Sequence, residues 1–413
     1  MEGETTPPAH GKWRQIGPGL VVAATGVGAG DLVATLIAGS RFGYALLWAA
    51  ILGCVVKIAL SEGSARYHLA TGSTILAGWR SLGRWTGWYF GIYVILWGFI
   101  YGATAMSATA LPLTALFPVL PLWGWAVLSG LAGLIFVWFN RYAAFELVMK
   151  LLVGVMFVIM VGLAILVAPG LPDLLSGLAF VLPEGALFYT MGLIGGVGGT
   201  VTTASYGYWV QVKGWRGPGW LPLMRLDNAI AYIVTGIFVI AMMIVGAELL
   251  HAGGIALQGG DRGLLDLAGV LADRFGTTIA TLFLVGFAAT AFSSVLGVWH
   301  GMSLFFADWF YQMRGEAAGG DREKTPAFRA YLLWLTFPPM LLLFAQQPFM
   351  LAVIYGAFGA LFMPFLAITL LLLLNSDHLP QGARSGWLAN GVLAGSALLF
   401  LLLAGQQLWQ MFG

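Results

Sequence analysis

The stretch GPGLVVAATGVGAGDLVATLIAGSRFGY, residues 17–44, decides the fold that we expect for this chain. It is apolar and long enough to cross a lipid bilayer, which takes about 20 residues in a helix. Its middle nevertheless holds three glycines in five residues, from Gly26 to Gly30, and then the carboxylate of Asp31. Glycine weakens a helix, and a carboxylate at membrane depth usually faces a cavity or a partner. We therefore predict a membrane helix that is broken at these glycines, beside a buried charge.

The composition of the whole chain indicates a polytopic α-helical membrane protein. Of its 413 residues, 60% are hydrophobic and only 9% are charged, whereas a soluble domain carries about 25% charged residues. Long apolar runs recur, in contrast to the short alternating segments of a β-barrel. No basic patch accompanies the net charge of +2, so we expect the lipid bilayer and no nucleic acid as a partner.

Eleven segments are apolar enough to span the bilayer. They cover residues 16–38, 43–66, 85–112, 121–139, 144–168, 187–212, 225–247, 278–310, 328–345, 349–374 and 386–405. With the N-terminus inside, nearly all lysines and arginines fall at cytoplasmic ends, and only Arg41, Arg262 and Arg274 fall outside. This asymmetry predicts a multi-pass protein of the cell (inner) membrane, with a cytoplasmic N-terminus and an external C-terminus.

A second glycine cluster lies five spans after the first. The segment MGLIGGVGGTVTTASYGYWVQ, residues 191–211, contains glycines from Gly195 to Gly199, followed by Thr200, Thr202, Thr203 and Ser205. Two inverted repeats of five helices predict this spacing, with the two broken helices facing each other at mid-membrane. Glycines also permit close helix packing. Their occurrence at corresponding positions, one cluster with an acid and the other with hydroxyls, favours a binding site of a secondary transporter.

Several motifs resemble those of the NRAMP family of metal-ion transporters. They are GPGL at 17–20, AGSRFGYALLW at 38–48, GSARYHLATG at 63–72, FELVMK at 145–150, GGTV at 198–201, AFSSVLG at 291–297 and MPF at 363–365. The resemblance covers nearly the whole chain, in order. It implies an all-α integral membrane protein of LeuT type, a five-plus-five inverted repeat with one extra helix and with helices 1 and 6 broken.

This architecture divides the chain into five parts. We expect a disordered cytoplasmic tail at 1–13, the first repeat at 14–168, an external loop at 169–186, the second repeat at 187–374, and the last span with the external C-terminus at 375–413.

The candidate site departs from the family pattern at both broken helices. The family's first broken helix reads Asp-Pro-Gly-Asn, in which Asp and Asn bind the metal, and the aligned residues here are GAGD at 28–31. The family's sixth helix supplies an alanine carbonyl and a methionine thioether, where this chain has Gly199 and Thr202. Acidic residues of the family's third helix align with Gly102 and Ala105. The chain therefore resembles a divergent branch with an altered metal site.

The remaining donors form a set of oxygen ligands, which suits hard cations. The set comprises the Asp31 carboxylate, backbone carbonyls near Gly28 and Gly199, and the hydroxyls of Thr202 and Thr203. We expect Asp31, Gly28, Gly199 and Thr202 to contact the metal, with Thr203 also at the substrate. These residues predict an NRAMP-like secondary transporter, without a cofactor, that moves a divalent cation such as Mg²⁺ or Mn²⁺ by alternating access.

Lys57, inside the second span, leaves another interpretation open. A lysine at that depth is costly unless it is paired, near water or reaching the cytoplasmic face. If its amine approaches Asp31, the pair neutralises the site, and the chain is instead a LeuT-fold carrier of a small neutral or anionic organic solute. Asp227, at the start of span seven, and His300, inside span eight, are further candidates for coupling or gating. Since the chain has no GxxxxGK[ST], HExxH or GxSxG motif, we do not expect an enzyme.

Overall fold

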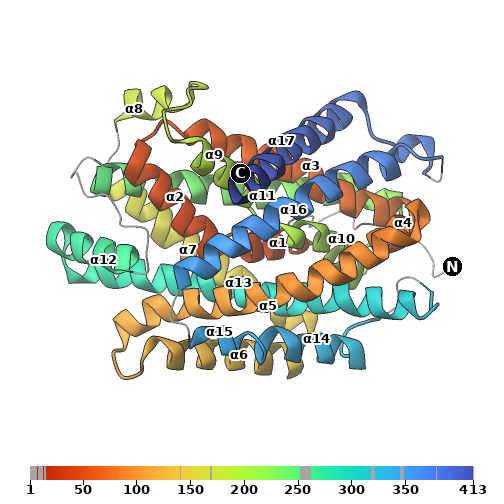
Figure 1. Ribbon diagram of the computed structural model, residues 1–413, viewed down its shortest axis with the longest axis horizontal. Coiled ribbons are helices and arrows are strands. Elements are labelled where there is room, and N and C mark those ends of the chain that lie inside the picture. The colour runs from red at the N-terminus through yellow and green to blue at the C-terminus, as the bar shows by residue number, and fades with distance from the viewer. Residues whose placement is uncertain are drawn as a thin grey trace.

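The computed structural model describes residues 15–139, 141–167, 170–251, 262–317, 321–344, 348–377 and 379–412, with positions 7 and 13. Most of the predicted tail, residues 1–13, lies outside these ranges. All regular structure within them is helical (Figure 1). The α-helices are α1 Pro18–Gly26, α2 Ala29–Phe42, α3 Leu47–Thr71, α4 Ile75–Leu82, α5 Arg84–Leu116, α6 Leu122–Phe139, α7 Tyr142–Leu166, α8 Leu171–Ser176, α9 Leu187–Gly196, α10 Tyr206–Val212, α11 Leu221–Gly246, α12 Arg262–Phe275, α13 Thr277–Met313, α14 Pro326–Thr336, α15 Met340–Leu343, α16 Pro348–Leu374 and α17 Trp387–Phe412.

Long apolar helices occupy the predicted spans. In the described part of the chain, seven of them are long and apolar enough to cross a membrane. They are α3, α5, α6, α7, α13, the stretch Pro218–His251 that contains α11, and the stretch Pro326–Leu343 that contains α14 and α15. Shorter apolar stretches, Phe362–Leu374 and Trp387–Leu402, lie in the last two predicted spans. The other two, spans one and six, are each divided into shorter helices.

The outer surface of α7 shows why this fold belongs in a bilayer. Large apolar side chains at helical spacing project outward, with Leu147 58%, Leu151 60%, Val158 70% and Ile165 71% exposed. The opposite face of the helix is buried in the protein and, apart from Glu146 near its start, is also apolar. A helix of a soluble protein carries polar residues on its outer face, so the face of α7 is suited to lipid.

The first predicted break is confirmed at residues 27 and 28. Helix α1 ends at Gly26, and α2 begins at Ala29. The amide of Gly28 bonds to the Gly26 carbonyl at 2.8 Å, and the amide of Leu32 returns to the carbonyl of Gly28 at 3.1 Å. The helical ladder therefore stops and restarts within two residues, of which Gly28 has an extended backbone.

The second predicted break is also confirmed, between α9 and α10. Gly198 and Gly199 have φ angles of +74° and +91°, in the left-handed region that favours glycine. A 3₁₀ helix, η2 (Val201–Ser205), follows and leads directly into α10.

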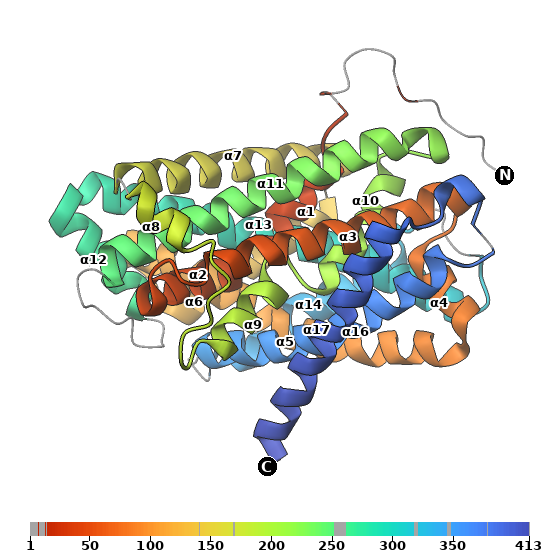
Figure 2. The ribbon, with the colours of Figure 1, turned by 90° about the horizontal axis from the view of Figure 1, so that it is seen from above.

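The two breaks meet backbone to backbone. A Cβ atom on Gly26 would overlap the carbonyl of Gly198, and one on Gly199 would lie 3.1 Å from the Cα atom of Gly26. Both views of the ribbon place α1 and α10 side by side among the longer helices (Figures 1 and 2). Glycine at these positions is therefore required for the contact between the broken helices.

Candidate functional site

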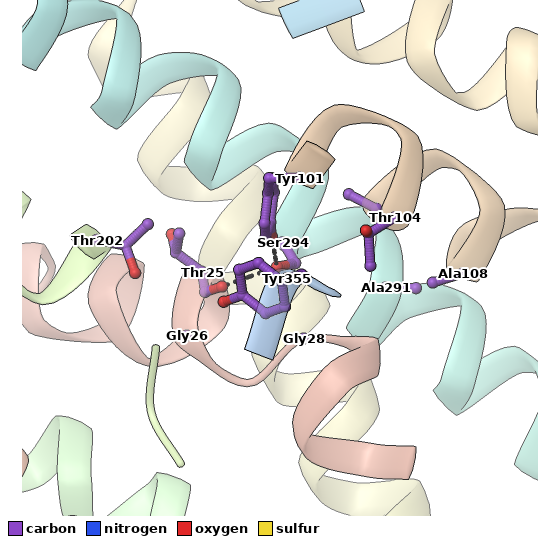
Figure 3. A pocket seen from close by; sticks show the side chains of 11 residues that line it. Thr25, Gly26, Gly28, Tyr101, Thr104, Ala108, Thr202, Ala291, Ser294 and Tyr355 are labelled. Carbon is purple, nitrogen blue, oxygen red and sulfur yellow. Dashed lines mark hydrogen bonds between the residues drawn. The ribbon is translucent and has the colours of Figure 1, made fainter. Parts of the chain in front are cut away.

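A small cavity lies against the first break and between four other segments (Figure 3). Its walls come from the break itself, from α5, α13 and α16, and from η2. The lining residues are Thr25, Gly26, Gly28, Tyr101, Thr104, Ala105, Ala108, Thr202, Ala291, Ser294 and Tyr355. None of them is charged, so the polar groups of the described lining are hydroxyls and backbone atoms.

A chain of hydrogen bonds orders one wall of this cavity. Ser294 donates to the carbonyl of Thr25 at 2.8 Å. Since a serine hydroxyl has one proton, the 2.5 Å contact between Tyr101 and Ser294 has the tyrosine as donor. The neighbouring Ser293 shares its single proton between the carbonyl of Ala24, at 2.9 Å, and that of Thr290 in its own helix, at 2.8 Å. Two serines of α13 thus bind carbonyls in the last turn of α1, where helical partners are lacking, and hold the broken end in place.

The size of the cavity restricts what fits in this conformation. The centres of water molecules have about 20 Å³ available, and one water needs roughly 10–15 Å³ by the same measure. The cavity therefore accommodates one or two waters, or an ion of similar size. A solute as large as an amino acid requires the walls to move apart.

The structure brings Gly28, Thr202 and Gly199 together around the cavity. Gly28 and Thr202 line it, and the α-carbon of Gly199 faces Gly26 and the Thr202 hydroxyl. Thr203 is fully buried and donates to the carbonyl of Gly199 at 3.3 Å. These contacts place four of the predicted residues at one point, although Thr203 does not line the cavity.

Asp31 lies in the first turn of α2, three residues after Gly28. Its backbone is helical, and its side chain lies outside what the structure describes. The acid thus follows the break in the chain, as expected, and its role stays a prediction.

Lys57 binds the second broken helix directly. The side chain, in the middle of α3, is 0% exposed. Its Nζ atom donates to the carbonyls of Gly195, at 2.8 Å, and Gly199, and lies 3.4 Å from the sulfur of Met363. The lysine therefore points to the second broken helix. Its ammonium shares the Gly199 carbonyl with Thr203, so that this carbonyl has two donors already.

Asp227 connects three helices at the other end of α1. The carboxylate accepts hydrogen bonds from the amides of Gly17, at 2.9 Å, and Gly19, at 2.6 Å, and from the hydroxyl of Tyr206 at 2.8 Å. It is fully buried within α11. The geometry shows that Asp227 caps the start of α1. Its coupling or gating role stays a prediction.

His300 lies apart from the cavity and uses both ring nitrogens. The indole of Trp209, which can only donate, bonds to Nδ1 at 3.2 Å, so Nε2 carries the proton and donates to Glu323 at 3.1 Å. Burial raises the pKa of Glu323, but the hydrogen bond from His300 and the charge of Lys324 outweigh it and lower this pKa below its usual value. A proton relay through His300 would have to break the bond to Trp209.

Sequence reasoning missed most of the cavity wall, including Thr25, Tyr101, Ser294 and Tyr355. One signal was available: the serine pair lies in AFSSVLG, which was singled out only as a family motif. The tyrosines lie among many aromatic residues of a membrane protein, and nothing local distinguishes them.

Comparison with known proteins identifies relatives along the whole chain. The family model "Natural resistance-associated macrophage protein-like" (Nramp) matches residues 19–410. The chain is 27% identical over 176 residues to "Metal transporter Nramp6.2" of Populus trichocarpa, covering 40% of this chain and 32% of that protein. It is 28% identical over 255 residues to "Divalent metal cation transporter MntH" of Chromohalobacter salexigens, covering 58% and 57%. The chain thus spans less than two thirds of these relatives' lengths.

Solved structures share the fold. The Eremococcus coleocola manganese transporter superposes with a TM-score of 0.81 at 18% identity, over 99% of this chain and 90% of that one. MhsT in complex with L-phenylalanine gives a TM-score of 0.62 at 16% identity, over 97% and 98%. The predicted architecture, with its broken first and sixth helices, is confirmed.

Proposed function

Because this chain belongs to the Nramp family, we propose that it is a multi-pass secondary transporter that moves a divalent metal cation by alternating access. The observation that carries the proposal is the meeting of the two broken helices at Gly26 and Gly199. Breaking two membrane helices removes backbone hydrogen bonds, and such backbone is tolerated where it is buried in protein or lines a cavity. A substrate site at the breaks explains this cost.

The cation would bind at the cavity through oxygen ligands. Gly28 and Thr202 are in its wall, and Asp31 follows in the first turn of α2. We propose that Asp31 supplies the charge interaction with the cation. A single carboxylate with waters and neutral oxygens is typical of Mg²⁺ sites, and the room for one or two waters fits a partly hydrated ion.

The proposed orientation has the N-terminus in the cytoplasm and the C-terminus outside the cell (inner) membrane. The distribution of lysine and arginine along the chain supports it. The Asp227 end of α1 would then be the cytoplasmic end of the first span.

A second candidate function is transport of a small neutral or anionic solute. The contact of Lys57 with the Gly199 carbonyl favours it, because an ammonium already occupies one of the expected ion ligands. An anionic group would be attracted to the same lysine. The small volume of the cavity opposes this candidate in the present conformation.

Uptake into proteoliposomes separates the two candidates. Purified protein is reconstituted and supplied with Mg²⁺, Mn²⁺ or Ca²⁺, or with a panel of labelled organic solutes. We expect saturable uptake of a divalent cation that Asp31→Ala abolishes and Asp273→Ala, an exposed acid on α12, leaves intact. Solute uptake without any cation uptake would replace the first proposal by the second. Cation uptake that survives Asp31→Ala would remove the role assigned to Asp31.

A further inference from the structure

The ammonium of Lys57 has the surroundings of a bound cation. It lies wholly inside the protein, and its contacts include two backbone carbonyls and a thioether sulfur. A buried ammonium is stable only where acceptors replace the water that it loses. The acceptors come from α9, from the second break and from α16, three segments that α3 approaches at this level.

One of the two carbonyls, that of Gly195, belongs to the last turn of α9, and the end of a helix attracts cations, whereas the carbonyl of Gly199 lies in the break. The amide of Gly199 bonds to the Gly196 carbonyl, which leaves the Gly195 carbonyl without its usual helical donor. Carbonyls at a helix C-terminus carry the negative end of the helix dipole. Without Lys57, the carbonyl of Gly195 would lose the donor that replaces its helical one, and the carbonyl of Gly199 would keep only the bond from Thr203 among those that the structure describes.

The lysine is also adjacent to the cavity. Gly199 separates them: its carbonyl accepts from Lys57, while its α-carbon faces Gly26 and Thr202, which line the cavity. A cation in the cavity would therefore be separated from a fixed positive charge by the backbone of one residue, Gly199. Like charges repel each other more strongly in a buried site than in water.

We infer that Lys57 is a built-in cation that occupies the carbonyls of the second broken helix and sets the selectivity of the site by weakening metal binding. The inference rests on the proposed function in one respect, that the two breaks form the substrate site. It goes beyond that function because it assigns the ion-selecting role to a residue that is not a metal ligand.

Variants that remove the charge of Lys57 but keep the approximate shape of its side chain test the inference. Lys57→Met keeps an unbranched side chain and removes the ammonium, and Lys57→Arg keeps the charge. Lys150→Met is the matched control, since Lys150 lies on α7 in a partly exposed ion pair with Glu146. Binding of Mn²⁺ and Mg²⁺ to the purified full-length variants is measured by titration calorimetry and by the shift in unfolding temperature.

We expect Lys57→Met to bind the metals at least about tenfold more tightly than the wild type, as removal of a nearby like charge requires. Lys57→Arg and Lys150→Met should stay within about threefold of the wild type, because both keep a positive charge at the site. A lysine that only supports the helix would lower stability when replaced and would leave metal affinity unchanged or weaker. If Lys57→Met does not fold, Lys57→Gln provides the same comparison with a polar side chain.

Equal or weaker metal binding by both neutral variants would overturn the inference, as would an equal gain in Lys150→Met. These results are independent of wild-type uptake. If the wild type transports no metal but Lys57→Met binds it, the proposed cation substrate is wrong and the role of Lys57 stands. If the wild type transports metal and the neutral variants bind it no better, only the inference fails.

Discussion

Replacement of Asp227 by asparagine should release the first half of the broken first span. One carboxylate oxygen accepts from the amide of Gly17, and the other accepts from the amide of Gly19 and from the hydroxyl of Tyr206. Asparagine offers one acceptor oxygen and one NH₂ group. In its best orientation it retains the Gly19 and Tyr206 bonds in weaker, uncharged form and places a donor against the Gly17 amide.

The magnitude follows from these three bonds. A hydrogen bond to a charged group contributes about 1.5–3 kcal/mol, and one between neutral groups about 0.5–1.5 kcal/mol. One lost bond and two weakened ones therefore cost about 2–4 kcal/mol, less than their sum because the chain relaxes. At 1.4 kcal/mol for each factor of ten, states with the start of α1 detached gain about 30- to 700-fold in population.

Hydrogen exchange of α1 measures this population directly. Peptides that cover residues 18–26 should exchange faster in Asp227→Asn, and by a smaller factor in Tyr206→Phe, which removes only one donor. Asp377→Asn is the control, because that side chain is 99% exposed and pairs with Arg384 near the surface. Exchange in α1 equal to that of the wild type, with intact global stability, would refute the assignment of Asp227 as the residue that holds α1.

Three further predictions concern the break and the two ends of the bundle. Gly26→Ala should abolish transport and destabilise the protein by about 3 kcal/mol or more, since its Cβ would overlap the backbone of the second break. The control Gly154→Ala, whose Cβ would meet open space, should be neutral or stabilising in thermal unfolding. Tyr44→Phe should lose about 1 kcal/mol through its 2.6 Å bond to Glu248, seen as faster hydrogen exchange at the end of α2. Because the pKa of Glu323 lies below its usual 4.5, its carboxylate stabilises the fold at pH values above 4.5. The difference in unfolding temperature between the wild type and Glu323→Gln should therefore shrink as the pH falls through the lowered pKa.

The sequence was sufficient to locate both breaks because glycine acts locally. The clusters around Gly28 and Gly198 lower helix stability wherever they occur, and their separation by five spans implied the repeat. The exact geometry needed the structure. The helix restarts at Ala29, so Asp31 belongs to the first turn of α2 and not to the open segment.

The cavity wall and the direction of Lys57 depend on neighbours that sequence does not specify. Tyr101, Ser294 and Tyr355 come from three helices that are far apart in the chain. The periodicity of apolar residues identifies which side of a helix is apolar. In a membrane protein both sides of a helix such as α7 are largely apolar, so periodicity does not show which side faces inward. For the same reason Lys57 left two directions open, and only the position of α9 beside α3 decided between them.

The two ends of the broken first span are held to α11 independently of each other. At one end Asp227 holds the start of α1, and at the other Tyr44 bonds to Glu248, which follows directly on α11. If the first span were one continuous, rigid helix, release of one end from α11 would strain the contacts at the other end. The break at residues 27 and 28 removes this coupling, because two non-helical residues absorb a change of direction. Each half of the span can therefore change direction without straining the other, as the alternating access that we propose for this chain would require.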